Sequence, residues 1–214
     1  MHVGPVKASD GINIPRRAGW FGDQMVSDLN PKWFEWVTRG FGFIYASAAA
    51  GVTFAVAGNN LPTFWNPAGS GVLFVPLRVY LGYVSATMVA GHVAWASLLN
   101  AGSQIGTGAP VVSLTDITPT NALIGVGRAR RVRFATTISF TAAPTYLRPA
   151  GQVNTLAGTA AAVVAPFPMV WDEDSGLVLA PGNALQLCAN AAIAMVASVA
   201  VLGLEIPLPP GWEG

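Results

Sequence analysis

The chain of 214 residues has little charge. Only 10% of its residues are Asp, Glu, Lys or Arg, against about 25% in an average soluble protein. The formal net charge is +1. The overall charge therefore does not predict a nucleic acid, an anionic lipid or an acidic substrate as partner. Because 52% of the residues are hydrophobic, we expect much of the surface to be covered, either by lipid or by other protein subunits.

Cysteine and histidine are nearly absent. The single cysteine, Cys188, excludes an internal disulfide bond and any metal site built from several cysteines. It lies in the apolar stretch ALQLCANAA, where we expect a small buried hydrophobe rather than a reactive thiol. His2 and His92 are the two histidines, and their spacing supports neither a catalytic dyad nor a three-ligand zinc site. We expect a structural role for His92, no cofactor or metal, and no enzymatic activity.

Lipid is one way to cover such a surface. Three stretches without a charged residue, 41–59, 79–99 and 184–204, approach the length of a membrane-spanning helix. They are rich in Ala, Gly, Ser and Thr, contain interior Asn, Gln and His, and have no cluster of Lys or Arg at their ends. An integral membrane protein therefore stays an alternative, and we expect neither a membrane partner nor a signal peptide in the polar first 30 residues.

The first 40 residues differ in composition from the rest. They hold nine formal charges and many Gly and Pro residues, and such a segment buries too little apolar surface to fold alone. We predict an extended arm over residues 1–40. Within NPKWFEWVTRG, Asn30 fits a helix N-cap, Pro31 the first helical position and Gly40 a stop. One short helix is predicted near 31–39, followed by a single domain over 41–214.

From residue 41 the pattern is that of β-strands. In VLFVPLRVYLGYV every second residue from Leu73 is apolar, and Pro76 predicts an edge position or a bulge because proline cannot donate to the ladder. The stretch AIAMVASVAVLGLEIPL is apolar on both faces, as in a strand that lies in a sandwich and also meets another subunit. In RRVRFATTISF one face is apolar, formed by Val132, Phe134, Ile138 and Phe140. We predict an all-β fold, an antiparallel β-sandwich of jelly-roll type.

Turn residues separate the expected strands. Further strands are predicted at about 42–49, 51–57, 88–98 and 157–165. Two short strands are expected on either side of a turn at Pro181-Gly182-Asn183. Residues 100–127 are rich in Gly, Thr and Pro and predict a long loop with one or two short strands.

The stretch NPAGSG at 66–71 looks like a glycine-rich phosphate cradle. A P-loop needs a following helix and a lysine, whereas here a strand-like VLF follows and the only lysines are Lys7 and Lys32. We therefore predict a turn into a strand, in which Pro67 fixes φ while Gly69 and Gly71 adopt conformations closed to other residues.

Two clusters of charge stand out in the domain. Asp172-Glu173-Asp174 could bind a hard cation, but we expect a solvated turn because adjacent carboxylates rarely converge on one ion. Among the arginines at 128, 130, 131 and 133, alternation places Arg131 and Arg133 on the outer face of a strand. There they could meet phosphate or carboxylates, and we expect an acidic patch of a partner protein rather than nucleic acid.

Seven tryptophans raise the alternative of a carbohydrate-binding module. Most of them lie among apolar neighbours, and we expect core or interface positions instead. The candidate partner contacts are basic and aromatic residues of the arm and of the arginine cluster: Arg16, Arg17, Trp20, Trp33, Trp36, Arg131 and Arg133.

Two stretches resemble virion structural proteins of tailed bacteriophages: FWNPAGSGVLFVPLRVYLGYVSATMVAG and DEDSGLVLAPGNALQLCANAAIAMVASVAVLGLEI. In that family an Asn-Pro-Ala-Gly-Ser-Gly turn precedes a strand, and a Gly-Leu-Val-Leu-Ala-Pro-Gly unit leads into the last strands of a β-sandwich. The resemblance implies a capsid decoration (cement) protein, a head fibre or a tail-associated component, commonly trimeric. It covers less than a third of the chain.

The leading expectation is a capsid decoration protein, located in the virion and assembled in the host cytoplasm. It would form a homotrimer and bind the major capsid protein through its arm or its loops. A tail, collar or fibre component with the same sandwich is the alternative.

Overall fold

The computed structural model describes residues 6–7, 13–14, 33–85, 91–102, 110–125, 128–153, 169–173, 176–190 and 195–208. The chain divides into two units, Met1–Glu35 and Trp36–Gly214. In the first unit, β1 (Val6–Lys7) and β2 (Asn13–Ile14) form an antiparallel pair. One helix, α1 (Phe34–Thr38), begins in the first unit and ends in the second.

The second unit is built from strands. They are β3 (Gly42–Ala46), β4 (Val52–Thr53), β5 (Thr63–Asn66), β6 (Val72–Ser85), β7 (Gly91–Leu98), β8 (Val111–Ile117), β9 (Thr120–Asn121), β10 (Arg133–Phe140), β11 (Thr145–Val153), β12 (Met169–Asp172), β13 (Asn183–Ala189) and β14 (Val196–Pro207).

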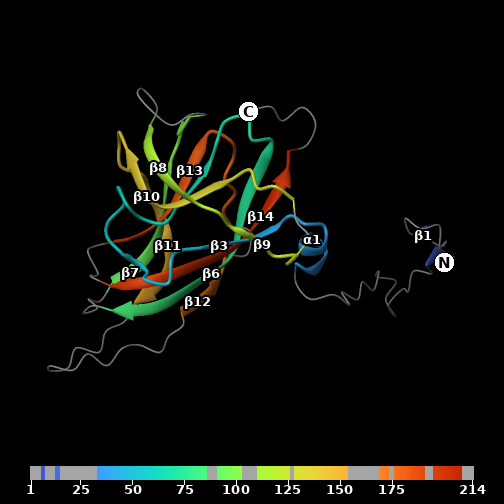
Figure 1. Cartoon of the computed structure of the whole chain (residues 1–214), viewed down its shortest axis with the longest axis horizontal. Coiled ribbons are helices and arrows are strands. Elements are labelled where there is room, and N and C mark those ends of the chain that lie inside the picture. The colour runs from blue at the N-terminus through green and yellow to red at the C-terminus, as the bar shows by residue number, and fades with distance from the viewer. Residues whose placement is uncertain are drawn as a thin grey trace, which may run out of the picture. The chain divides into compact units, whose positions relative to one another are not determined.

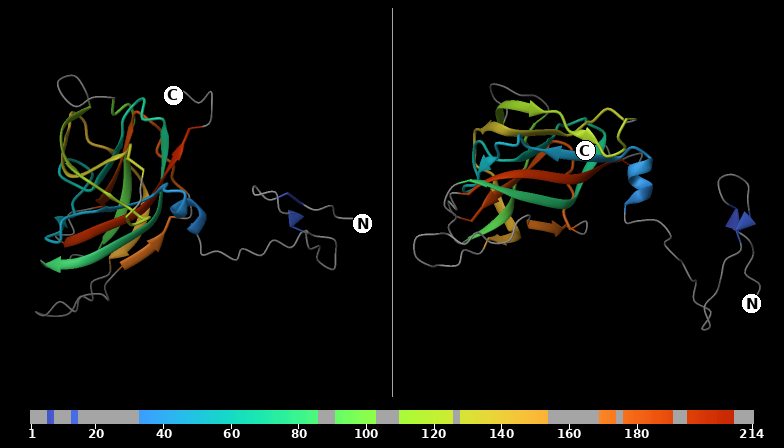
Figure 2. Two further views of the ribbon diagram at one scale, coloured as in Figure 1. Left: turned by 45° about the vertical axis from the view of Figure 1, so that its right-hand side comes forward. Right: turned by 60° about the horizontal axis from the view of Figure 1, so that its bottom comes forward.

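These strands form two antiparallel sheets that pack face to face (Figures 1 and 2). The order in the first, here the β13 sheet, is β11-β7-β13-β5-β10-β8. The order in the second, the β14 sheet, is β12-β6-β14-β3-β9, with β4 also pairing with β14. The predicted all-β sandwich with one short helix is confirmed.

Aromatic side chains from both sheets fill the space between them. Phe64 of β5 stacks on Phe74 of β6 with ring centroids 4.9 Å apart, and Tyr45 of β3 meets both rings edge-on. Phe134 of β10 lies 5.0 Å from Phe64, and Trp95 of β7 closes the cluster. All five are fully buried. Such offset and edge-to-face ring pairs add about 0.5–1.5 kcal/mol each beyond their buried area.

The longest pairing joins β6 to β14 and contains the predicted bulge. Arg78 pairs with Leu202 and Pro76 with Gly203, so Leu77 is the extra residue of β6. Proline is tolerated there because a bulge removes one ladder hydrogen bond. On β14, buried residues alternate with half-buried ones along most of the strand, as expected for a strand that is apolar on both faces.

Helix α1 ends as predicted but starts later. Gly40 has φ +77° and donates its N–H to the Val37 carbonyl, while the Phe41 N–H bonds to the Trp36 carbonyl. This is a Schellman motif, and the Trp36 and Phe41 rings, 5.9 Å apart, supply its apolar contact. The helix begins at Phe34 rather than at Pro31. The predicted cap at residues 30–31 lies outside the described residues.

The NPAGSG stretch is a turn, as predicted. Gly69 and Gly71 have φ of +78° and +72°, and the Ser70 N–H bonds to the Pro67 carbonyl at 3.1 Å. The chain then enters β6 at Val72. The space where a Cβ of either glycine would lie is open, so conformation alone favours glycine there.

Other strand predictions differ in extent. The strands predicted at 42–49 and 51–57 are shorter in the structure, where they are β3 and β4. The predicted loop at 100–127 contains two strands, β8 and β9. Of the two strands expected around the turn at Pro181, the one after the turn is β13. Before the turn, Leu179 makes an isolated bridge to Phe74 instead of a strand. The described part of the strand predicted at 88–98 is β7, and the strand predicted at 157–165 lies outside the described residues.

Candidate binding surfaces

The arginine cluster divides into two pairs. Asp116 on β8 accepts two hydrogen bonds from Arg130, at 2.9 and 2.7 Å, and one from Arg133 at 3.0 Å. The Arg133 guanidinium also lies 5.4 Å from the centre of the Trp65 ring. Burial acts to raise the pKa of Asp116, but the hydrogen bonds from both arginines outweigh it and hold this pKa below its usual value. Arg133 therefore has internal partners, and its predicted contact with another protein stays a prediction.

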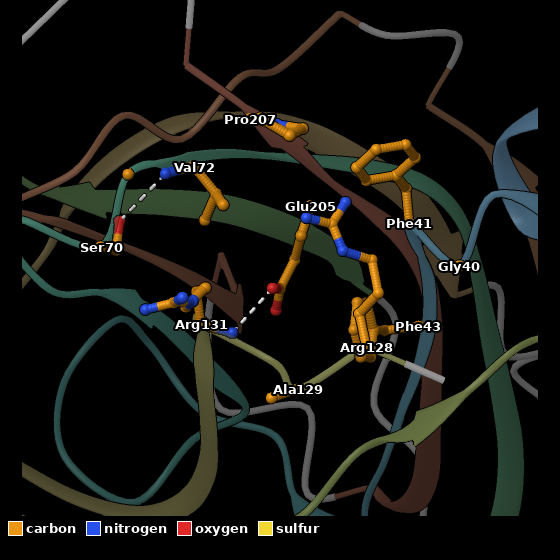
Figure 3. Close-up of a pocket in the computed structure, with 11 residues that line it drawn as sticks. Gly40, Phe41, Phe43, Ser70, Val72, Arg128, Ala129, Arg131, Glu205 and Pro207 are labelled. Atoms are coloured by element: carbon orange, nitrogen blue, oxygen red, sulfur yellow. Dashed lines mark hydrogen bonds between the residues drawn. The ribbon is translucent and has the colours of Figure 1, made fainter. Parts of the chain in front are cut away.

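The other pair, Arg128 and Arg131, lines a pocket of about 320 Å³ (Figure 3). The pocket brings together four segments that are distant in the sequence. Its lining residues come from the end of α1 and β3, from the NPAGSG turn, from the chain before β10, and from β14: Gly40, Phe41, Phe43, Ser70, Gly71, Val72, Arg128, Ala129, Arg131, Glu205 and Pro207.

Inside this arginine pocket the two guanidinium groups lie on different sides. Figure 3 shows Arg128 reaching between Phe41 and Glu205, and Arg131 extending on the side of Ser70. The Arg128 guanidinium carbon is 4.4 Å from the centre of the Phe41 ring, a cation–π contact. Arg131 is exposed, and within the described part of the chain its side chain has no acidic partner.

Glu205 forms the buried side of the pocket, with only 4% of its surface exposed. Its Oε1 accepts the Tyr45 hydroxyl at 2.5 Å and the Val132 N–H at 3.0 Å, and its Oε2 accepts the Arg131 N–H at 2.7 Å. Burial, as the larger cause, and the Glu205 carboxylate, as the smaller one, raise the pKa of the Tyr45 hydroxyl well above its usual value. The hydroxyl therefore stays protonated and serves as a donor.

A second buried carboxylate corrects a sequence prediction. Glu173 was expected in a solvated turn, but it is only 4% exposed. It accepts hydrogen bonds from the indole N–H groups of Trp95 and Trp171, at 2.7 and 2.9 Å, and from Arg148. These donors satisfy the buried charge, which would otherwise be costly. The side chain of its neighbour Asp172 is about a third exposed and paired with Arg78.

The outer face of the β14 sheet is apolar over several strands. The register places Ile44, Leu202 and Arg78 in one row, and Ala46, Ala200, Tyr80 and Val170 in the next. Ile44, Tyr80, Val84 and Val170 are exposed, between 36% and 46%. Arg78 and Asp172 hold each other at the end of the first row through two hydrogen bonds. We name this surface the outer β14 face.

A second pocket, of about 280 Å³, lies near β7 and β13. It is lined mainly by aliphatic side chains: Leu99, Leu147, Leu177, Val178, Leu179 and Leu185, with Ser97, Ala180, Asn183 and Ala184. None of the described residues that line it is charged.

Two of the remaining predicted contacts, Trp33 and Trp36, lie next to and within α1. Trp36 is 37% exposed and packs on Phe41, while Trp33 is half-buried and has φ +68°. The predicted contacts at Arg16, Arg17 and Trp20 lie outside the described residues. The aromatic residues Trp65 and Trp95 are core residues, as predicted.

Cys188 and His92 are the residues with nucleophilic or acid–base chemistry weighed from the sequence. Cys188 is fully buried as predicted, and burial raises the pKa of its thiol to about 11. His92 is on β7, with Nε2 2.9 Å from the Tyr146 hydroxyl. Among the described residues, no three His, Cys, Asp or Glu side chains are grouped so that they could hold a metal ion. None of the helices in the described residues is long and apolar enough to span a membrane.

Comparisons with protein-family models, with curated protein sequences and with solved structures found no match to this chain. The arginine pocket and the outer β14 face therefore rest on geometry alone. Sequence reasoning missed the pocket because Ser70, Arg128 and Glu205 converge only through sheet pairing. It anticipated part of the outer face, since β14 was expected to be apolar on both sides.

Proposed function

We propose that the protein is a structural subunit that associates with further copies of itself through the outer β14 face. As the resemblance to tailed-phage virion proteins implies, the assembled form would be a capsid decoration protein. The observation that carries the proposal is the exposed apolar surface formed by Ile44, Tyr80, Val84 and Val170.

Burial of this face has a low electrostatic cost. Its charged side chains, Arg78 and Asp172, already hold each other, and this pairing raises the pKa of Arg78 further. A second subunit could cover them without leaving an unpaired charge, which is the costly case. An apolar face without net charge does not attract a strongly charged partner. A second copy of the same face is equally apolar and can therefore pack against it.

The capsid part of the proposal rests on composition and on the resemblance. A decoration protein meets both its own copies and the capsid lattice, so little of its surface stays in water. The low proportion of charged residues, 10%, supports such a covered surface. A trimer binding the major capsid protein is the form that the resemblance implies.

The test of self-association is a charge placed on the outer β14 face. Ile44→Asp should shift the chain from oligomer to monomer in sedimentation velocity, because burial of an unpaired carboxylate is unfavourable. Val56→Asp is the matched control, since Val56 is 55% exposed and lies between β4 and β5. It should leave the oligomer intact. A wild-type chain that stays monomeric at every concentration would overturn the proposal.

The position in a virion separates the two structural candidates. Electron cryomicroscopy of particles carrying the protein should show copies spread over the head lattice. Copies confined to the tail or collar would favour the tail, collar or fibre alternative, to which the same apolar face applies. If purified virions do not contain the protein, both candidates are refuted.

A further inference from the structure

The arginine pocket has a surplus of positive charge. The four arginines between residues 128 and 133 face two carboxylates, those of Asp116 and Glu205. Asp116 pairs with Arg130 and Arg133, so among the described residues Glu205 is the one carboxylate that lines the pocket with Arg128 and Arg131. The Glu205 carboxylate already accepts three hydrogen bonds from Tyr45 and the backbone. A guest anion would therefore meet a net positive site.

We propose that this pocket binds a carboxylate side chain of an acidic peptide segment, held between Arg128 and Arg131. Two guanidinium groups on different sides of a concave site suit a planar carboxylate, to which each can donate paired N–H groups. The inference stands apart from self-association, because none of the pocket residues belongs to the outer β14 face.

Arg128 is held in place before any ligand arrives. Its guanidinium lies over the Phe41 ring, and its Cγ would be 3.3 Å from a Cβ at position 40. Gly40 therefore serves two purposes, since its φ of +77° ends α1 and its missing side chain leaves room for Arg128. An arginine fixed in this way loses less conformational entropy on binding than a free one.

The NPAGSG turn supplies the accessible rim. The space where a Gly71 Cβ would lie is open, so a ligand can approach the backbone there. The Ser70 hydroxyl oxygen lies 3.5 Å from the Val72 N–H and lines the pocket. Its proton is available to a carboxylate, because a hydroxyl can accept and donate at once.

The walls favour a peptide over a nucleic acid. Phe43, Val72 and Pro207 are apolar, and a volume of about 320 Å³ is near the lower end of the usual range for small ligand pockets, about 300–1,000 Å³. This accommodates one acidic side chain with an apolar neighbour. A polynucleotide would call for a basic stripe with aromatic side chains free for base stacking, whereas Phe41 is covered by Arg128.

The experiment follows the arginine side-chain Nε–Hε signals of the full ¹⁵N-labelled chain by NMR. The probes are a short capped peptide with the sequence Leu-Glu-Glu, the matched Leu-Gln-Gln peptide, inorganic phosphate and a short oligothymidylate. The Leu-Glu-Glu peptide should produce saturable shifts of Arg128 and Arg131, and Leu-Gln-Gln should not. Arg131→Gln should weaken the binding about tenfold or more, the size expected for a lost hydrogen bond to a charged group.

Matched variants keep the result interpretable. Arg131 is exposed, so its replacement should leave the fold unchanged, which the remaining spectrum reports. Lys7→Gln removes the same charge from the Met1–Glu35 unit and should bind like the wild type. Equal shifts with the Gln peptide, undiminished binding by Arg131→Gln, or tighter binding of phosphate or oligothymidylate than of the Glu peptide would each overturn the proposal. These readouts do not depend on the oligomeric state.

Discussion

Gly203 of β14 lies directly beside the Phe74 ring of β6, the neighbouring strand of the same sheet. A Cβ at this position would lie 2.3 Å from Cε2 and 2.8 Å from Cζ of Phe74. The Phe74 ring is fully buried and stacked on Phe64, so it has no space into which to move. Gly203→Ala should therefore lower the free energy of unfolding by about 1–3 kcal/mol, the usual cost of overpacking a core. Urea unfolding followed by tryptophan fluorescence measures it.

Gly58→Ala is the matched control for this substitution. The nearest atom to a Cβ at Gly58 is the Val56 carbonyl oxygen at 3.7 Å, an ordinary contact, and the residue does not need a positive φ. Its replacement should leave stability unchanged or raise it slightly, because alanine restricts the unfolded chain. Equal losses in the two variants would show that the contact with Phe74 is not the cause.

At the scale of elements, Asp116 connects β8 to β10 and the segment before it. Its pKa is held below the usual value, so its contribution to stability is present above the unfolded-state pKa, about 3.9, and is lost as the pH falls through the lower folded-state pKa. Asp116→Asn should therefore destabilise the protein at neutral pH, and the difference from the wild type should narrow in acid. Unfolding free energies at neutral pH and at about pH 2 give the comparison.

Asp172→Asn provides the reference for an outer-surface ion pair. With both substitutions made in the Ile44→Asp background, in which the outer β14 face stays in water, Asp172 and Arg78 are each about a third exposed, and such pairs contribute less because water screens them. Its effect should be smaller than that of Asp116→Asn. If the loss caused by Asp116→Asn is the same at both pH values, the ion pairs with Arg130 and Arg133 are not its source.

The sequence predicted those elements whose cause is local. Gly69 and Gly71 mark a turn, Pro76 marks a bulge and Gly40 ends a helix, because each conformation depends on the residue itself. Strand order was not predictable, since it depends on contacts between segments far apart. The error at Glu173 has the same origin: its neighbours in the chain are acidic, whereas Trp95 and Arg148, which bind it, are distant in sequence.

At the scale of the whole molecule, the two units should differ in their roles. Both sheets and the buried core clusters belong to Trp36–Gly214. A chain lacking residues 1–32 should therefore unfold at the same denaturant concentration as the full chain, measured by circular dichroism. A large loss of stability would mean that the first unit helps to fold the second.

The same truncated chain tests the proposed role of the arm in the virion. If residues 1–40 bind the capsid lattice, the truncated chain should fold but should be lost from the particles. Retention at full occupancy would leave the loops of the sandwich as the capsid contact. Occupancy is measured by quantitative gel analysis of purified particles, with the full chain as the control.

The strand order also has a consequence for synthesis on the ribosome. β14 lies between β6 and β3, and β13 lies between β7 and β5, so the centre of each sheet comes from a late part of the chain. The hydrogen bond from Tyr45 to Glu205 joins residues 160 positions apart. Until residues 196–207 have left the exit tunnel, β3 and β6 therefore lack their shared neighbour. Nascent chains should need protection by a chaperone during that interval, since unpaired strand edges aggregate readily.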